Sequence, residues 1–361
     1  MKNITMVSCQ HFQSGIGHYG YELAKHISKK NGQVELYKPF KPNHPDQHYH
    51  QHKWIKPIHY RSFRQMHPYL LPLFIRNAIG KTSSDVYHAH WFMSGLALTY
   101  FVQKPVVVTM HDVSLLHVLE KGSRYQQYYH WAIERFRKRR IPLIVVSETA
   151  RQDTIQYANY PQELVHAIPN GINFERFFPT QKKKANEKFT IVYAGGLGKR
   201  KNVGLLLKAF QQLEKKYSVQ LRIAGAFPER TEYPNIAKEL GLKNVEFTGY
   251  LPDEEMNAFY NQGDLMIYPS EYEGFGFAPL EAMAAGTPVL CAKGGALSEI
   301  SGGGAMLLDY NVEDLVNKTS LLITNTDKRM ELAERGKHWV KKYSWERCAM
   351  ETTEVYQHVI R

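Results

Sequence analysis

Residues 264–288 read DLMIYPSEYEGFGFAPLEAMAAGTP, a short apolar run followed by a helical pattern. The run DLMIYPS is apolar enough for a buried strand, and Pro279 and Gly286 mark the two ends of a helix. The glycines of the intervening turn let the backbone approach a ligand, and the first N–H groups of the helix favour an anion such as phosphate. The segment therefore predicts a strand–loop–helix unit of an α/β sheet, with a ligand site at the carboxyl end of the strand.

Two glutamates, Glu273 and Glu281, stand eight residues apart across this turn. We expect the first on the rim of the loop and the second in the first helical turn, so that both carboxylates face one crevice. Carboxylates accept hydrogen bonds from paired hydroxyls, which sugars and riboses offer. The alternative is structural, because a glutamate near a helix N-terminus often only caps the helix or meets its dipole.

The sequence around the pair resembles a known family. EGFGFAPLE, followed by AMAAGTPVL, is similar to the E-x7-E signature of retaining glycosyltransferases of family 4. The resemblance implies the GT-B fold, in which two Rossmann-like doubly wound α/β domains face a central cleft that holds the site. It spans essentially the whole chain and is strongest over residues 191–300.

The composition fits two ordinary globular domains. The chain has 361 residues, of which 43% are apolar, and it lacks an apolar run of the roughly 18 residues that would span a bilayer. The N-terminus shows no secretory pattern, and the three cysteines show no CxxC spacing. A cytoplasmic protein with inert thiols is the simplest interpretation.

Charge is uneven along the chain. Residues 1–172 hold 21 of the 46 Lys and Arg residues but only 10 of the 34 Asp and Glu residues, and 15 of the 17 histidines. Such a basic domain favours an anionic lipid surface or a phosphorylated substrate, with nucleic acid as the weaker option that we do not predict. The aromatic and basic residues of 61–81 can lie in a membrane interface, although a helix packed on the sheet is the alternative. We therefore expect a cytoplasmic enzyme that can sit at the inner face of the membrane.

A glycine-rich segment follows the first predicted strand, ITMVS (4–8). Gly15 and Gly17 belong to GIGHYG, which is formally G-x-G-x-x-G before the predicted helix YELAKHISKK. This pattern keeps an NAD-dependent oxidoreductase as an alternative. Against it, the glycines stand several residues after the strand, and Glu35 lies within the next strand instead of at its end. The segment resembles the glycine loop of family 4 enzymes, which lies near the sugar-nucleotide phosphates and the acceptor.

Histidines occur at two other notable places. His48, His50 and His52 alternate in a polar stretch, which suggests a metal site, but a surface loop is the favoured interpretation because nothing there completes a ligand set. His111 ends the predicted strand PVVVTMHD. The segment TMHD resembles the T-x-H-D of family 4, whose histidine contacts the donor sugar, whereas His88 and His90 match a structural strand.

The second half alternates strands and helices cleanly after residue 188, which predicts a parallel sheet. We place domains at 1–172 and 173–344, with a C-terminal helix at 345–361 that the family packs on the first domain. GGLGKRKN, at 195–202, follows a strand and can hold a diphosphate through its cations and glycine amides. The family often has an arginine where this chain has Gly196, and Arg200 is its expected substitute.

The resemblance implies a retaining transfer of a sugar from a nucleoside-diphosphate sugar to a glycan, lipid-linked or cell-envelope acceptor. UDP-sugars are slightly favoured over GDP-mannose, and a non-catalytic sugar-nucleotide-binding subunit is the alternative that Gly196 favours. No D-x-D occurs in the sequence, so we predict no metal and no cofactor. The predicted catalytic residues are His111 and Glu273, and the predicted donor-binding residues are Gly15, Gly17, Arg200, Lys201, Tyr250, Leu251, Gly274, Phe275, Gly276 and Glu281.

Overall fold

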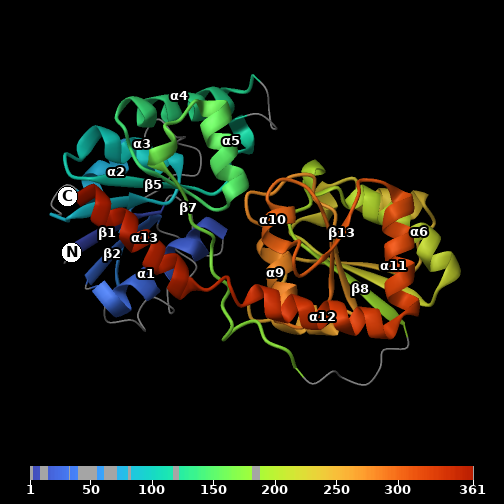
Figure 1. Cartoon of the computed structure of the whole chain (residues 1–361). Helices are drawn as coiled ribbons and strands as arrows, with labels where there is room; N and C mark the ends of the chain where they lie inside the picture. Colours follow the sequence, from blue (N-terminus) through green and yellow to red (C-terminus); the bar gives the residue numbers. More distant parts are fainter. Residues whose placement is uncertain are drawn as a thin grey trace. The chain divides into compact units, whose positions relative to one another are not determined.

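The computed structural model describes residues 3–8, 15–31, 33–39, 55–60, 71–79, 83–116, 122–180 and 188–360. It divides into two compact units, Met1–Gly171 with Ser344–Arg361, and Ile172–Tyr343. Each unit has a parallel sheet with helices on both faces (Figure 1). The predicted α/β class with two doubly wound sheets is confirmed.

The first unit has a seven-stranded sheet in the order β3-β2-β1-β4-β5-β6-β7, and every pair in it is parallel. The order reverses between β1 and β4, which is where doubly wound sheets bind ligands beyond the carboxyl ends of their strands. The strands are β1 (Asn3–Val7), β2 (Gln33–Pro39), β3 (Ile55–Tyr60), β4 (Val86–Ala89), β5 (Val106–Met110), β6 (Leu143–Val145) and β7 (Val165–Ala167). The helices are α1 (Gly15–Asn31), α2 (Leu71–Ile79), α3 (Phe92–Phe101), α4 (Arg124–Lys138), α5 (Glu148–Ala158) and α13 (Trp345–Ile360), with the 3-10 turns η2 (Ser114–Leu116) and η3 (Gln162–Leu164).

The core of this unit lies between sheet and helices. β5 is buried along its whole length, as expected of a central parallel strand that helices cover on both faces. Helices α2, α3 and α4 pack in sequence on one another, whereas α1 packs against α13. The two ends of the first unit's chain are thus held together, because the last helix lies beside the first one (Figure 1).

Helix α1 begins at Gly15, six residues before the predicted start at Tyr21. Gly15 and Gly17 therefore lie in its first turn and not in a preceding loop, where glycine costs little because the first N–H groups have no partner within the helix. Gly20 has a packing role. A Cβ atom there would lie 2.4 Å from Nδ1 of His90, so only glycine lets α1 approach the end of β4 this closely.

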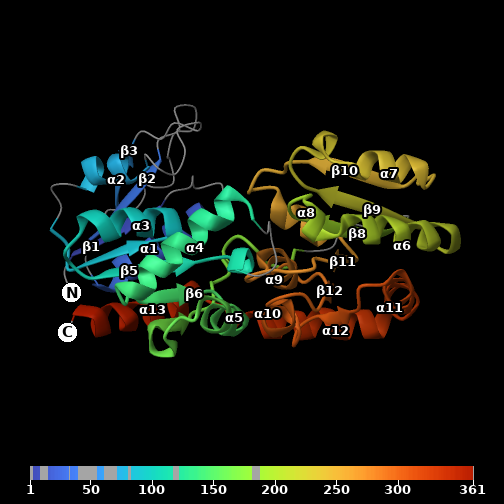
Figure 2. The same cartoon turned by 90° about the horizontal axis from the view of Figure 1, so that it is seen from above.

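The second unit has a six-stranded parallel sheet in the order β10-β9-β8-β11-β12-β13. Helices α6 and α11 pack together, and α9 packs with α8 and α12 (Figure 2). The strands are β8 (Phe189–Ala194), β9 (Val219–Ala224), β10 (Val245–Gly249), β11 (Leu265–Tyr268), β12 (Val289–Ala292) and β13 (Met306–Leu308). The helices are α6 (Val203–Lys216), α7 (Tyr233–Glu239), α8 (Met256–Gln262), α9 (Phe277–Ala284), α10 (Leu297–Ser301), α11 (Val312–Thr324) and α12 (Thr326–Val340), with η4 (Lys199–Lys201) and η5 (Pro228–Arg230).

Two predictions on the central segment need correction. Helix α9 starts at Phe277, before Pro279, so Glu281 lies in its second turn and not in its first. The reason is that Gly276 adopts a left-handed backbone with φ of +90° and ends the loop there, which leaves Pro279 inside the first turn. The shift moves Glu281 away from the capping positions of the helix and weakens the purely structural interpretation of its carboxylate.

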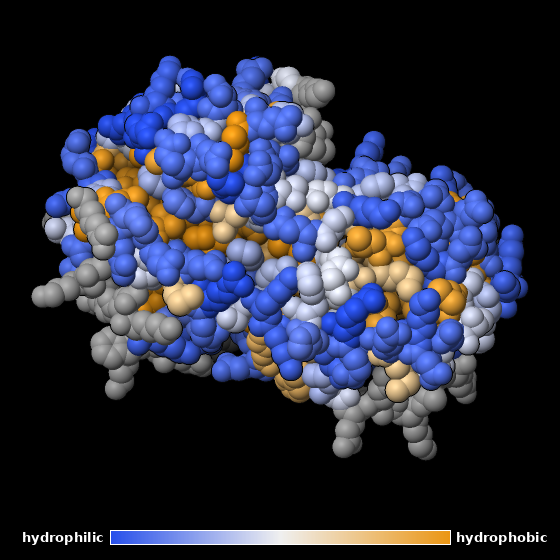
Figure 3. All heavy atoms as spheres, viewed as in Figure 1, coloured by the Kyte–Doolittle hydropathy of each residue, from blue (hydrophilic) through white to orange (hydrophobic). Residues whose placement is uncertain are grey.

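Several predicted features lie outside the described residues: the histidine-rich stretch with His48, His50 and His52, residues 61–70 and 80–81 of the aromatic-basic stretch, and the lysine-rich residues 181–187. Within the described ranges, no helix combines the length and the apolar character needed to cross a bilayer. Hydrophilic residues cover most of the face shown in Figure 3, and smaller hydrophobic areas are exposed between them.

Candidate functional site

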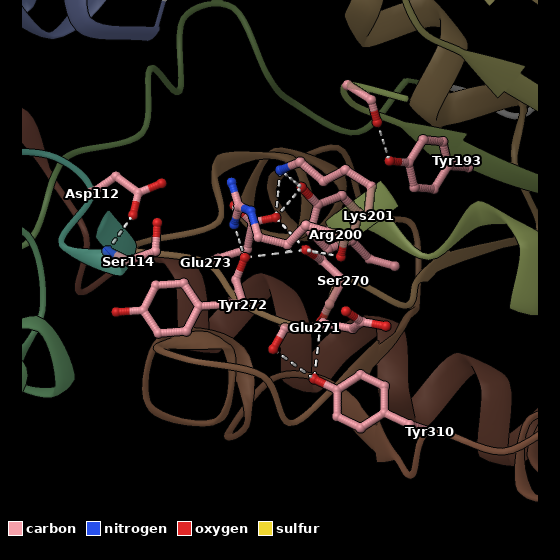
Figure 4. A network of polar contacts seen from close by, with 12 residues as sticks. Asp112, Ser114, Tyr193, Arg200, Lys201, Ser270, Glu271, Tyr272, Glu273 and Tyr310 are labelled. Carbon is pink, nitrogen blue, oxygen red and sulfur yellow. Dashed lines mark hydrogen bonds and ion pairs between the residues drawn. The ribbon is translucent and has the colours of Figure 1, made fainter. Parts of the chain in front are cut away.

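Glu273 is the centre of a polar cluster in the second unit, just beyond the carboxyl end of β11 (Figure 4). Its side chain is buried, and its Oε1 atom accepts hydrogen bonds from Lys201 Nζ at 2.5 Å, Ser270 Oγ at 2.6 Å and Tyr268 OH at 3.1 Å. These donors come from β11, its following loop and η4. Carboxylates on loops are ordinarily exposed to water, so a buried carboxylate with three hydrogen-bond donors is unusual.

Arg200 joins the cluster from η4. Its Nη1 atom lies 3.5 Å from Glu273 Oε2 and donates a hydrogen bond to the carbonyl of Tyr272. The two cations thus approach different oxygens of one carboxylate, Lys201 at Oε1 and Arg200 at Oε2. The structure brings together three of the predicted site residues, Arg200, Lys201 and Glu273, although some 70 residues separate the cations from the glutamate along the chain.

Backbone contacts fix the loop that carries Glu273. The N–H of Glu271 donates to the carbonyl of Arg200 at 2.9 Å, which ties this loop to η4. Tyr310 donates to the carbonyls of Ser270 at 3.0 Å and Glu271 at 3.2 Å, and the N–H of Ala296 donates to the carbonyl of Glu273 at 2.8 Å. The loop is therefore held from three sides, so that its carboxylate has a defined position.

The glycine turn at 274–276 leads directly from this loop into α9. Phe275 is buried, with its ring edge-on to Phe277 at 5.0 Å and to Tyr343 at 5.9 Å, so it anchors the turn instead of facing a ligand. Gly276 is the N-cap of α9 and no side chain caps it. An anion at the first N–H groups of α9, beside Gly274 and Gly276, stays a prediction from the sequence.

Glu281 lies in a separate polar group. Its Oε2 atom accepts a hydrogen bond from Tyr260 OH of α8 at 2.8 Å. Burial raises the pKa of Glu281, while the Tyr260 bond and the charge of Arg176 act in the opposite direction. Arg176 itself is fixed by Asp253, with its Nη2 atom 3.0 Å from Oδ1. The two glutamates therefore have different partners: the cations of η4 surround Glu273, whereas a tyrosine fixes Glu281.

Tyr250 and Leu251 follow β10. Gly249, which ends the strand, adopts a left-handed backbone with φ of +74°, and Tyr250 is exposed beyond it. Both residues therefore stand at the carboxyl edge of the second sheet.

His111 belongs to the first unit and follows β5. Its ring lies edge-on to Tyr19 of α1 at 4.5 Å, and a hydrogen bond with the backbone of His90 holds it. Burial lowers the pKa of His111 to about 3. The imidazole is therefore neutral near pH 7, and as a neutral ring it can donate one hydrogen bond and accept another. Among the described residues, its buried Nε2 atom has no hydrogen-bond partner.

Sequence reasoning missed the residues that orient these groups. Tyr268, Ser270 and Tyr260 donate to the two glutamates, and Tyr193 stacks on Tyr268 with ring centroids 5.7 Å apart. Their positions at strand ends and on α8 gave no chemical signal, because a tyrosine in an apolar run is ordinarily part of the core. No group of three or more metal-binding side chains able to hold an ion occurs in the described part of the chain.

Comparison with known proteins supports one family over almost the whole chain. Residues 13–176 match the model described as Glycosyltransferase Family 4, and residues 174–339 match Glycosyl transferases group 1. The O-antigen chain mannosyltransferase B of Escherichia coli is 25% identical over 378 residues, covering 95% of this chain and 96% of that protein.

Solved structures agree in fold. Sucrose-phosphate synthase from Thermosynechococcus elongatus superposes with a TM-score of 0.85 at 20% identity and covers 99% of both chains. Anabaena HepE, solved in complex with UDP and glucose, superposes with a TM-score of 0.78 at 19% identity, covering 99% of this chain and 100% of that one.

Proposed function

Because the chain belongs to glycosyltransferase family 4, enzymes of GT-B fold that transfer a sugar from a nucleotide sugar, we propose that it performs this transfer with retention at the anomeric carbon. The family match sets aside the NAD-dependent oxidoreductase and the non-catalytic subunit. The acceptor class remains the predicted one, a glycan, lipid-linked or cell-envelope acceptor.

The cluster of Arg200, Lys201 and Glu273 is the observation that carries the proposal. When a glycosidic bond to a nucleoside diphosphate breaks, negative charge develops on the diphosphate, and fixed cations stabilise that charge in a partly buried site. Arg200 and Lys201 occupy the strand-to-helix turn after β8, where the sheet presents its ligands. Glu273 beside them supplies a carboxylate that can accept hydrogen bonds from sugar hydroxyls.

The remaining roles follow from position. Glu281, fixed by Tyr260, would accept from the ribose hydroxyls, and the backbone at Tyr250 and Leu251 would contact the base. The N–H groups of Gly274, Phe275 and Gly276 would meet the sugar or the phosphate next to it. In the first unit, the neutral ring of His111 would hydrogen-bond the donor sugar, and the first turn of α1, with Gly15 and Gly17, would lie near the phosphates and the acceptor.

A ligand screen tests the proposal. Thermal unfolding should be measured with UDP-sugars, GDP-mannose and NAD(H), because a ligand that binds only the folded protein raises the unfolding temperature. We expect stabilisation by a nucleoside-diphosphate sugar and by its free diphosphate, and release of that diphosphate over time. Stabilisation by NAD(H) alone would overturn the proposal.

UDP-sugars are our first choice of donor, with GDP-mannose second. The Anabaena structure holds UDP and glucose, whereas the Escherichia coli relative is by its name a mannosyltransferase, so the comparisons support both choices. The same screen separates them. A larger shift with GDP and GDP-mannose than with UDP and UDP-glucose would reverse the order.

We also propose that the first unit docks on an anionic membrane through an aromatic strip on α3 and α4. The strip consists of Tyr100 and Trp131, 43% and 47% exposed, with ring centroids 6.4 Å apart. Arg135 stacks over the Tyr100 ring at 3.6 Å, and Arg76 of α2 over Phe101 at 5.2 Å. Exposed aromatic rings interleaved with cations suit the interface between lipid headgroups and acyl chains.

The charge around the strip fits an anionic surface. Helices α2 and α3 contain no acidic residue, and the one acidic residue of α4, Glu134, is neutralised by Arg137 at 2.8 Å and Lys138 at 3.5 Å. Each basic residue near an anionic leaflet contributes about 1 kcal/mol at most, and salt screens that attraction.

Cosedimentation with vesicles tests the docking. Wild type should bind vesicles that contain anionic phospholipid, bind neutral phosphatidylcholine vesicles less, and lose binding as salt rises. Replacing Tyr100 and Trp131 together by Ser should abolish binding, whereas the matched change Tyr157→Ser, at an aromatic of similar exposure on α5, should not. Binding that does not depend on lipid charge and salt, or that persists in the variant with both Tyr100 and Trp131 replaced, would contradict the proposed docking.

A further inference from the structure

Tyr268 occupies a position that the proposed roles leave unused. It is the last residue of β11, its side chain is almost fully buried, and its ring stacks nearly parallel to that of Tyr193, at an interplanar angle of 15°. A tyrosine buried this way packs well without its hydroxyl. Among the described residues, its hydroxyl has two hydrogen-bond partners, the ammonium of Lys201 and the carboxylate of Glu273.

The hydroxyl links cation and carboxylate. Lys201 Nζ donates to the Tyr268 oxygen at 3.1 Å, and Tyr268 donates its own hydrogen to Glu273 Oε1 at 3.1 Å. The same ammonium also lies 5.6 Å from the centre of the Tyr268 ring, within the range of a cation–π contact. Tyr268 therefore contacts both Lys201 and Glu273.

The donors around Glu273 are distributed unequally. Lys201, Ser270 and Tyr268 all gather on Oε1, whereas Arg200 lies 3.5 Å from Oε2. With three hydrogen bonds, Oε1 has little capacity left for a ligand. The sugar of a donor would therefore meet Oε2.

Binding of a donor must disturb this arrangement. If Lys201 turns toward the diphosphate, Glu273 loses its closest cation, and a buried carboxylate that loses a partner is costly unless other donors remain. Ser270 and Tyr268 are those donors. We propose that Tyr268 is a positioning residue, whose hydroxyl holds Glu273 in place and guides the ammonium when Lys201 moves from Glu273 to the diphosphate. The inference rests on the proposed function and deepens it.

The change Tyr268→Phe tests it, because it removes only the hydroxyl. We expect kcat to fall about tenfold to a hundredfold, the loss that one hydrogen bond to a charged group predicts. KM for the donor and Kd for the free nucleoside diphosphate should change by less than about threefold, because Arg200 and Lys201 remain. A general structural defect would instead lower thermal stability and worsen all of these constants together.

A double-mutant cycle shows whether the hydroxyl acts through Glu273. In a Glu273→Ala background, Tyr268→Phe should lower kcat by less than about twofold further, because the acceptor that the hydroxyl holds is gone. Tyr193→Phe is the matched control from the same ring stack. Its hydroxyl donates to the carbonyl of Gly196 at 2.7 Å, so its effect should be equal in both backgrounds.

Two results would overturn the inference: a wild-type kcat in Tyr268→Phe, or the same loss in both backgrounds. Should Tyr268→Phe fail to fold, Ser270→Ala removes the other hydroxyl from Oε1 and should show the same coupling to Glu273. A wild-type protein that releases no diphosphate from any nucleoside-diphosphate sugar would be a failure of the proposed function itself, and the inference would fall with it.

Discussion

Gly196 stands where the sequence pattern of the family often has an arginine, and the structure shows what surrounds this position. A Cβ atom at Gly196 would meet only the Cε atom of Lys201, at 3.9 Å, and the backbone there does not require glycine. The place of the missing arginine is thus sterically open. Arg200 reaches Glu273 from four residues further along, which supports its proposed role as substitute.

Restoring the arginine tests this substitution. Arg200→Ala should weaken binding of the free nucleoside diphosphate about tenfold or more, because a hydrogen bond to a charged group is lost. Gly196→Arg should fold with wild-type thermal stability and, combined with Arg200→Ala, recover most of the lost affinity in calorimetry. Met330→Arg, which adds the same charge at an exposed position on α12, should recover none. No recovery by Gly196→Arg would show that Arg200 does not replace the family arginine.

At the scale of elements, the contact of α13 with the first sheet depends on neutral histidines. His88 of β4 is fully buried, with its Nδ1 atom 2.5 Å from Tyr356 OH of α13 and its Nε2 atom 2.7 Å from Thr109 Oγ1 of β5. Burial and the neighbouring His111 lower the pKa of His88 to about 3. Burial, followed by the neighbouring His88 and His111, also lowers the pKa of His90.

These lowered pKa values predict acid sensitivity. A histidine whose pKa falls from 6.5 to about 3 on folding binds fewer protons when folded, so its contribution to stability is complete above pH 6.5 and is lost as pH falls toward 3. Between these two pKa values, each such histidine lowers the free energy of unfolding by about 1.4 kcal/mol for every pH unit of acidification. Urea unfolding between pH 8 and pH 4.5 should show this loss, and His88→Gln should flatten it while the exposed control His130→Gln should not. A pH-independent unfolding free energy would contradict the buried neutral cluster.

Most elements could be predicted from the sequence, because apolar runs such as that of β5 are a strong local signal. Strands β3 and β7 and helices α3, α11 and α12 were not predicted: β7 has only three residues, and β3 lies in the irregular part of the first half. The start of α9 was misplaced because the left-handed backbone of Gly276 ends the loop and the helix begins at Phe277, before the proline that marked the predicted start. Leu297 packs so closely there that a Cβ atom at Gly276 would lie 2.7 Å from its side chain, and the sequence pattern does not show such a contact.

The sequence indicated which residues form the candidate site, but not which hydrogen bonds connect them. The motifs indicated Arg200, Lys201, Glu273 and Glu281. The sequence did not indicate which carboxylate oxygen each donor reaches, nor which tyrosines orient the two glutamates. Several of these contacts join side chains that lie far apart in the sequence. Pattern and spacing carry no information on such contacts.

At the scale of the whole molecule, the cations of the second unit suggest how the chain handles the leaving group without a D-x-D motif. In the proposed function, Arg200 and Lys201 supply the positive charge that a bound metal ion would otherwise bring to a diphosphate. Donor turnover should therefore persist in excess EDTA at about the rate measured with added Mg²⁺ or Mn²⁺. Loss of turnover in EDTA that Mg²⁺ or Mn²⁺ restores would contradict this assignment of charge.

Calorimetry with the free nucleoside diphosphate tests the central claim, that the two glutamates divide the donor between them. Glu281→Gln should weaken binding of UDP, or of GDP if that is the preferred base, about tenfold or more, because the amide accepts less strongly from the ribose hydroxyls. Glu273→Gln should bind the diphosphate no more weakly than wild type, since in the proposed function Glu273 meets only the sugar of the donor, and loss of its charge releases Lys201. Wild-type affinity in Glu281→Gln, or an equal loss in both variants, would contradict the account.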